Sequence, residues 1–212
     1  MQVHDKLFIG GRWVDPAGSD VIEVISPHTE EVVGRVPEGT TADIDRAVAA
    51  ARRAFDEGEW PRMSPEERIA AVQRFSDAYA ARMMDLAEVI TTEMGSPISF
   101  SQLAQTPAPW MMLNTFIQVA KDHPWEEERS GVLGSPVVVR SEGVGVVGAI
   151  VPWNVPQFVT MSKLAPALLS GSTIVIKPAP ETPLDAFVMA EILEEAGIPE
   201  GVVSVVPAGR EV

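Results

Sequence analysis

The sequence predicts an α/β fold built on a Rossmann-like parallel sheet that is incomplete in its number of strands. Residues 143–183 follow the order strand, helix, strand, and a further helix and strand follow up to Val206. Residues 143–212 are therefore expected to form a β-α-β-α-β segment. Because a helix that connects two strands of one sheet places them parallel, its three strands should form a parallel sheet. A β-hairpin near the N-terminus is the third feature, since two β-rich runs meet at Gly10-Gly11.

The N-terminal part is expected to hold short strands followed by helices. Leu7–Val14 and Val21–Val36 have the composition of short strands. A helix is expected to begin at Thr41, because apolar residues then recur at helical spacing at Ile44, Ala47, Val48, Ala51 and Phe55. The motif Ser64-Pro65-Glu66-Glu67 is typical of the start of a second helix, which is expected to run to about Ile90.

A third helical segment and a charged connection are expected in the middle of the chain. Pro107 and Pro109 interrupt the helical pattern, which resumes through Trp110–Val119. Glu126–Glu128 is expected to be an exposed connection, and Val132–Arg140 a strand that leads back to the glycine-rich segment.

The segment after Gly143 places two polar residues where parallel sheets bind ligands. Val144–Val151 is predicted as a buried strand, Met161–Leu169 as a helix and Thr173–Ile176 as a second strand. Ligands of such sheets bind beyond the carboxyl ends of the strands. Asn154 follows the first of these strands, and Lys177 ends the second.

The glycines Gly143, Gly145 and Gly148 match the pattern G-x-G-x-x-G, but we reject a phosphate-binding loop here. That fingerprint requires a strand before the glycines and a helix that opens at them. Here the glycines lead into a strand. They are expected to permit a close backbone crossing where the chain enters the sheet.

A last helix and strand complete the predicted half-sheet. Thr182 is expected to be the N-cap of a helix, with Asp185 three residues later, and Gly197 ends it. Val202–Val206 is the third strand. A half-sheet of this kind is expected to leave an unpaired strand edge.

Composition indicates a soluble globular protein. The 212 residues are 46% hydrophobic and 22% charged, with a formal net charge of −14. This negative charge argues against nucleic acid or an anionic membrane as partner. Without an apolar run of membrane-spanning length or an apolar signal segment, a cytoplasmic location is expected. His4, His28 and His123 lack metal-ligand spacing, so they are interpreted as surface residues and no metal site is predicted.

Three motifs in order resemble the aldehyde dehydrogenase superfamily. They are Val-Pro-Trp-Asn at residues 151–154, Lys-Leu-Ala-Pro-Ala-Leu at 163–168 and Lys-Pro-Ala-Pro-Glu-Thr-Pro at 177–183. The resemblance extends over the whole chain, including its opening strands. Members of that family are more than twice as long, so the likeness is to their N-terminal portion only.

The resemblance implies an aldehyde dehydrogenase type of fold and the NAD(P)-dependent oxidation of an aldehyde to a carboxylic acid. Residues 1–130 would be the N-terminal hairpin and the helical part of the cofactor domain. Residues 131–142 would be a crossing strand of the oligomerisation type, and residues 143–212 the first half of the Rossmann-like domain. The implied cofactor is NAD, with NADP as the alternative, and the implied assembly is a homo-oligomer, either dimer or tetramer.

The resemblance also implies a set of site residues. Asn154 would donate its side-chain amide to the oxygen of a tetrahedral intermediate, and Lys163 would take part in proton relay. The positions implied for cofactor binding are Ile150, Val151, Pro152, Trp153, Lys177, Ala179, Pro180 and Glu181. Those implied for the aldehyde tunnel are Val155, Val159 and Ser162, and the absence of large aromatic side chains there predicts a tunnel wide enough for bulky aldehydes.

From the residues alone, simpler interpretations stay open. Asn154 is a typical turn residue. Lys177 is equally a solvated lysine that ends a buried strand, and Lys163 an ordinary lysine on a helix surface.

The sequence contains no cysteine. This composition fits a disulfide-free cytosolic protein. For the resembled family it also means that the nucleophilic cysteine is missing, together with the segment of the general base. A non-catalytic chain, truncated or a pseudoenzyme, which binds nucleotide or a partner, is therefore the alternative to an aldehyde dehydrogenase.

Overall fold

The computed structural model describes all residues from Met1 to Val212 and confirms the α/β fold. Its main sheet has five strands in the order β3-β2-β10-β9-β8. Neighbouring strands β8, β9 and β10 are parallel, as the sequence predicted. The antiparallel hairpin β2–β3 extends the sheet beyond β10. The bounds are β2 Leu7–Ile9, β3 Arg12–Val14, β8 Val146–Ile150, β9 Thr173–Lys177 and β10 Val203–Val205.

Strand β2 of the hairpin pairs with the edge of β10 that the parallel strands leave open. The free edges of the main sheet are therefore β3 and β8. Gly10 and Gly11 connect its strands with φ of 62° and 78°. Two successive positive φ values suit the tight turn of a two-residue hairpin, and glycine adopts them without strain.

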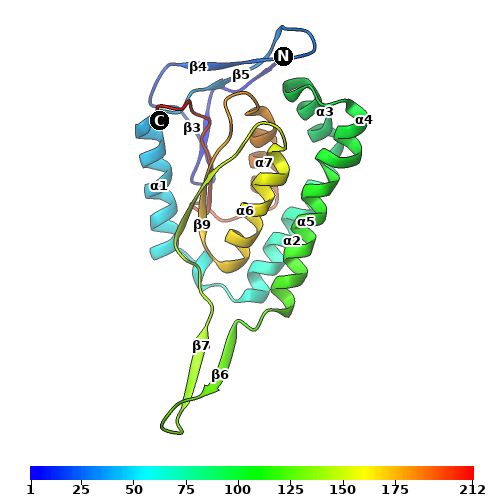
Figure 1. Cartoon of the computed structure of the whole chain (residues 1–212). Helices are drawn as coiled ribbons and strands as arrows, with labels where there is room; N and C mark the ends of the chain where they lie inside the picture. Colours follow the sequence, from blue (N-terminus) through cyan, green and yellow to red (C-terminus); the bar gives the residue numbers. More distant parts are fainter.

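Helices lie on both faces of the main sheet (Figure 1). Helix α1 covers one face, whereas α6 and α7 cover the other, with α2 and α5 packed outside α6. This layering packs 41 buried apolar residues into one continuous core. The helical bounds are α1 Thr41–Asp56, η1 Trp60–Arg62, α2 Pro65–Ala81, α3 Met83–Met94, α4 Ile98–Phe100, the π-helical turn η2 Ser101–Gln105, α5 Pro107–Asp122, α6 Pro156–Ser170 and α7 Leu184–Glu195.

A second sheet lies beyond one end of the main sheet, at the top of Figure 1. It has the order β1-β5-β4, with β1 Gln2–Val3, β4 Val21–Ile25 and β5 Val32–Pro37.

A two-stranded arm projects from the opposite end of the body (Figure 1). Strands β6 Glu126–Ser130 and β7 Pro136–Arg140 pair only with each other. The prediction of a plain connection at Glu126–Glu128 was therefore wrong.

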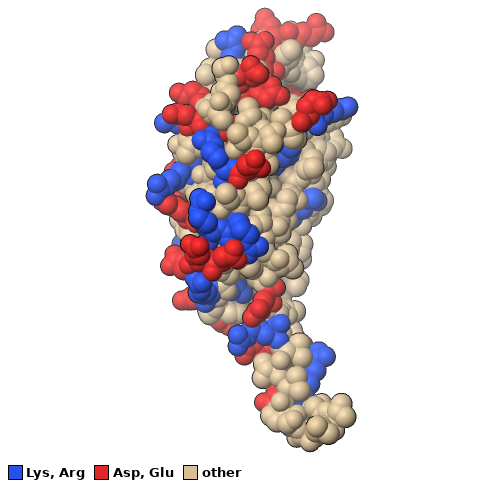
Figure 2. Space-filling view, turned by 90° about the vertical axis from the view of Figure 1, so that its left-hand side faces the viewer, with Lys and Arg blue, Asp and Glu red and all other residues tan.

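Figure 2 shows charges of both signs over the body of the molecule, whereas the tip of the arm lacks them.

The single helix predicted from Ser64 to Ile90 is two helices. Ser64 forms the expected capping box with Glu67, but α2 ends at Ala81 and α3 begins at Met83. Arg82, between them, is paired with carboxylates of both α3 and α7. Neither glycine nor proline marks the break, so the local sequence did not predict it.

The glycine-rich entry to β8 is a backbone crossing, as expected. A Cβ atom on Gly143 would lie 2.9 Å from the backbone of Gly171 and of Ser172. Gly148 lies within β8 and no helix opens there. This local geometry agrees with rejecting the dinucleotide fingerprint.

Candidate functional site

The carboxyl ends of β8 and β9 lie side by side and start the two loops of the candidate site. Ile150 is opposite Lys177 in the parallel register. The Val151 backbone N–H donates to the Lys177 carbonyl oxygen over 3.0 Å. The loop at residues 151–155 and the loop at residues 178–183 therefore leave the sheet from neighbouring points, which is where parallel sheets bind ligands.

The first loop presents its side chains outwards. Trp153 is 54% exposed, Ile150 is 77% exposed, and Pro152 and Asn154 are also exposed. The Asn154 side chain has no hydrogen bond within the chain, so both N–H groups of its amide are free to donate. Val151 is buried and offers only its backbone to the loop.

A side chain outside the first loop holds the backbone of this loop. The Gln105 Nε2 group donates to the Asn154 carbonyl oxygen over 3.3 Å. Helix α6 begins at Pro156, five residues before the predicted start at Met161, because proline fits the first helical position.

The three positions predicted for an aldehyde tunnel share one side of α6. Val155, Val159 and Ser162 are all half-buried, at spacings of four and three residues. The Val159 N–H donates to the Val155 carbonyl over 3.1 Å, and the Ser162 hydroxyl donates to the Val159 carbonyl over 2.7 Å. Lys163 is half-buried, and its Nζ lies 3.5 Å from the Ser162 hydroxyl.

Lys177 ends β9 with an unpaired amine. It is half-buried, and its Nζ makes neither a hydrogen bond nor an ion pair within the chain. Burial lowers the pKa of Lys177, whereas the charges of Glu181 and Glu38 oppose that shift. The amine is thus free for an external oxygen acceptor, in a negative local field.

An open hollow of about 530 Å³ brings several predicted cofactor residues together. Trp153 comes from the first loop and Pro180 and Glu181 from the second, whereas Lys177 and Ala179 lie outside its wall. The remaining wall is formed by Ile22, Glu23, Ile25, Pro27, Glu93, Met94 and Thr182.

The second loop is anchored by buried carboxylates that the sequence did not reveal. Glu93 of α3 accepts hydrogen bonds from the backbone N–H groups of Leu184 and Asp185, over 2.8 and 2.9 Å. Glu93 thus caps α7, and the prediction of Thr182 as N-cap was wrong. Gln157 of α6 donates to the Asp185 carboxylate over 2.8 Å. Local sequence gave no signal for Glu93, Gln157 or Gln105, because each acts on a residue distant in the chain.

Both buried carboxylates hold their protons more tightly than usual. Burial raises the pKa of Asp185 from its ordinary value of 3.8 to about 7. Burial, and then the neighbouring Asp185, raise the pKa of Glu93 well above its ordinary value. Ionisation of either group is disfavoured further by a charge on the other.

The family model described as the aldehyde dehydrogenase family matches residues 13–212. The chain belongs to the aldehyde dehydrogenase family. A relative called geranial dehydrogenase, from Castellaniella defragrans, is 38% identical over 98% of this chain and 43% of its own length. Another, called 3-succinoylsemialdehyde-pyridine dehydrogenase, from a Pseudomonas species, is 40% identical over 97% of this chain and 42% of its own length.

Solved aldehyde dehydrogenase structures have the same fold. One from Mycobacterium tuberculosis, complexed with NAD+, has a TM-score of 0.95 and 48% identity, covering 99% of this chain and 43% of the other. An indole-3-acetaldehyde dehydrogenase from P. syringae, with NAD+ and IAA, has a TM-score of 0.94 and 34% identity, covering all of this chain and 43% of the other. The chain thus spans under half the length of these aldehyde dehydrogenases. Each of its helices is too short or too polar to cross a membrane.

Proposed function

We propose that residues 1–212 supply the oxyanion donor and part of the cofactor site of an enzyme that oxidises aldehydes to carboxylic acids. The observation that carries the proposal is the pair of free donors at adjacent strand ends. The Asn154 amide follows β8, the Lys177 amine ends β9, and neither has a partner within the chain. Family membership supports the same chemistry.

Asn154 is proposed to stabilise the reacting oxygen. When a nucleophile adds to an aldehyde, negative charge develops on the carbonyl oxygen. A neutral amide N–H can donate to that charge at any pH, because it does not titrate in the working range. Lys163, farther along α6, is proposed to assist proton transfer, as the family resemblance implies.

Lys177 is proposed to bind hydroxyls of the cofactor's adenosine ribose. A bound nicotinamide dinucleotide would accept a hydride, and the chain's residues would hold and orient it. The surrounding Ile150, Val151, Pro152, Trp153, Ala179, Pro180 and Glu181 complete the proposed site. Glu181 and Glu38 place negative charge near Lys177, which supports NAD over NADP because the latter carries an additional phosphate.

Residues 1–212 alone are proposed to oxidise no aldehyde. The sequence contains no cysteine, so it supplies no thiolate to attack the carbonyl. The same observation favours a second candidate function, a non-catalytic module that binds nucleotide or a partner subunit.

A wide tunnel for bulky aldehydes and a homo-oligomeric assembly complete the proposal. Val155, Val159 and Ser162 are small on the proposed tunnel side, and two relatives are named for geranial and for 3-succinoylsemialdehyde-pyridine. The arm β6–β7 exposes Val137, Val138 and Val139, which supports its use between subunits of a dimer or tetramer. The cytoplasmic location expected from the sequence stays part of this proposal.

The test compares residues 1–212 with a fused enzyme. In that enzyme, residues 1–212 replace the matched 43% of the Mycobacterium tuberculosis relative and are followed by the rest of it. Formation of NADH is followed with several aldehydes. The fused enzyme is expected to turn over, and residues 1–212 are expected to be inactive. An inactive but folded fused enzyme would favour the non-catalytic candidate, and turnover by residues 1–212 alone would contradict the proposed division of the catalytic groups.

A further inference from the structure

We propose that Gln105 is a positioning residue that holds the Asn154 loop in its donating conformation. This inference rests on the proposed oxyanion role of Asn154. Gln105 is only 5% exposed, and its Nε2 group donates to the Asn154 carbonyl oxygen over 3.3 Å. No other side chain forms a hydrogen bond with residues 152–155.

The support beneath Gln105 is itself well connected. Gln105 ends the π-helical turn η2, in which the Thr106 backbone N–H and hydroxyl both donate to the Ser101 carbonyl, over 3.2 and 3.3 Å. The Thr91 hydroxyl of α3 donates to the Ser101 hydroxyl over 2.9 Å. Single π-helical turns are uncommon and occur often at functional sites. Here the turn positions the buried Gln105 side-chain amide so that it reaches the Asn154 loop.

A second contact limits how Gln105 can move. Its Nε2 group also lies 3.7 Å from the Met94 Sδ atom at the end of α3. Both contacts use the same nitrogen, so they orient its two N–H groups towards α3 and the loop. A neutral amide makes this bond without placing a charge beside the reacting centre.

Holding a backbone carbonyl holds the side chain on the same residue. The Asn154 carbonyl belongs to the peptide plane between Asn154 and Val155, so fixing it restricts ψ of Asn154. The direction of the Asn154 Cα–Cβ bond relative to the sheet is then restricted too. Because Asn154 is exposed and its side chain has no partner, this backbone restraint is what limits the positions that the amide can reach. An oxyanion donor is effective only when it is placed before the charge develops.

The test uses Gln105→Met in the fused enzyme, since methionine keeps the length and volume but cannot donate. We expect kcat to fall roughly tenfold, the scale of one lost hydrogen bond, with the cofactor KM unchanged. Gln102→Met is the matched control, because Gln102 lies on the same turn and its side chain is exposed and makes no hydrogen bond. The control is expected to keep the parent kcat.

A double variant of Gln105 and Asn154 distinguishes a positioning role of Gln105 from a general loss of structure. In the Asn154→Ala background, Gln105→Met should lower kcat no further, because its target is already gone. Gln105→Glu adds a second readout. Its carboxylate would face the Asn154 carbonyl as an acceptor, whereas its protonated form could donate, so its kcat relative to Gln105→Met should rise as pH falls.

The outcomes distinguish this inference from the proposed function. If Asn154→Ala lowers kcat and Gln105→Met does not, the positioning role is wrong while the oxyanion role stands. If the Gln105→Met loss is undiminished in the Asn154→Ala background, Gln105 acts by another route and the inference is overturned. If Asn154→Ala itself leaves kcat unchanged, the proposed function fails first.

Discussion

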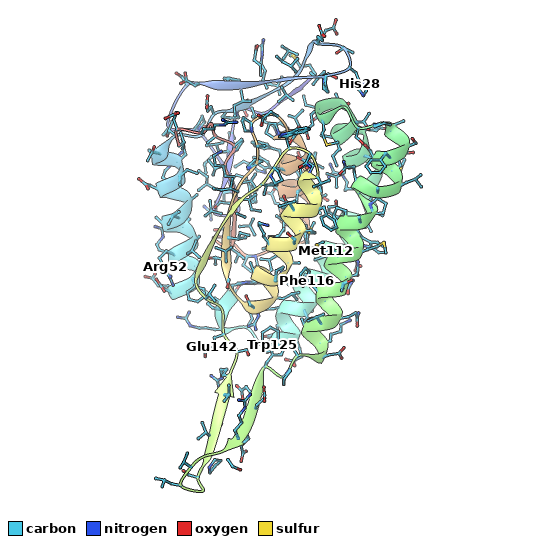
Figure 3. The ribbon with its side chains drawn as sticks, viewed as in Figure 1. His28, Arg52, Met112, Phe116, Trp125 and Glu142 are labelled. Atoms are coloured by element: carbon cyan, nitrogen blue, oxygen red, sulfur yellow. The ribbon has the colours of Figure 1, made fainter.

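The two loops that leave β8 and β9 begin side by side but are anchored in opposite ways. The loop at residues 151–155 exposes Pro152, Trp153 and Asn154 and accepts one side-chain hydrogen bond, from Gln105. The loop at residues 178–183 leads into α7, whose N-terminus is capped by the buried Glu93 and linked to α6 through Gln157 and Asp185. Figure 3 shows how densely side chains fill the space between the sheet and its helices, with Met112 and Phe116 on α5.

This difference indicates a division of tasks. A loop held only through its backbone keeps its side chains free for substrate, whereas a loop fixed by buried side-chain hydrogen bonds gives a rigid support for a bound cofactor. Changes at Asn154 and Val155, at the end of the first loop, should therefore alter the chemistry of the aldehyde. Changes in the second should alter cofactor affinity or stability.

The largest expected effect is that of Asn154→Ala in the first loop. Removing an oxyanion donor should lower kcat of the fused enzyme about 10²- to 10³-fold, with the cofactor KM nearly unchanged. Steady-state rates of NADH formation measure it. A variant that keeps more than half of the parent kcat would remove Asn154 from the chemistry.

Asp185→Asn tests the anchoring of the second loop through pH. The folded state holds the Asp185 proton up to about pH 7, whereas the unfolded chain releases it near 3.8. The folded state thus binds more protons between these pH values, so this group's contribution to stability falls as pH rises. Asparagine does not titrate, and it can still accept from Gln157.

The fused enzyme carrying Asp185→Asn should therefore lose less stability than its parent between pH 5 and pH 8, by about 2 kcal/mol. The measurement is the thermal midpoint of each protein across that range. Glu93 and Tyr79 face the same group, and both have raised pKa values that asparagine would relax. Parallel pH profiles for the two proteins would show that Asp185 is ionised in the folded state throughout.

Lys177→Ala should affect the cofactor and not the aldehyde, in contrast to Asn154→Ala. Losing the amine is expected to raise the cofactor KM about tenfold, the scale of a hydrogen bond from a charged group, and to leave the aldehyde KM nearly unchanged. Titrations of both substrates measure it. Arg12→Ala, on the far hairpin with an exposed ion pair to Glu200, is a suitable control. An unaltered cofactor KM would exclude Lys177 from the site.

The smallest expected kinetic effect is that of Val155→Phe. A larger side chain at the start of α6 should narrow the proposed tunnel and lower kcat/KM for an aromatic aldehyde roughly fivefold relative to acetaldehyde. The cofactor KM should stay constant, because Val155 is not among the residues proposed to bind the cofactor. Equal losses for both aldehydes would place Val155 outside the tunnel.

Local sequence was enough to predict the elements that meet at the site. β-Branched runs marked β8, β9 and β10, and the Gly10-Gly11 turn marked the hairpin. The capping box at Ser64 was also confirmed, since its two partners are three residues apart. These features depend on neighbours in the chain, and a single sequence contains that information.

Features that depend on distant partners were not predictable. Glu93 caps a helix that begins about 90 residues later, and it displaced the expected local cap at Thr182. Gln105 reaches a loop 49 residues away. Strand β6 has no alternation of apolar and polar residues, because both its faces are largely exposed. At Glu93 and Gln105 a tertiary contact replaced a local pattern, whereas β6 lacked a pattern to read.

The double variant Asn154→Ala, Lys177→Ala tests the division of tasks between the loops most directly. Its steady-state kinetics in the fused enzyme should combine the two single effects: kcat as low as in Asn154→Ala, and the cofactor KM as high as in Lys177→Ala. Independent sites give this additivity. If instead each single variant changed both parameters, and the double variant lost no more than one of them, the two loops would act as one unit and the account would be wrong.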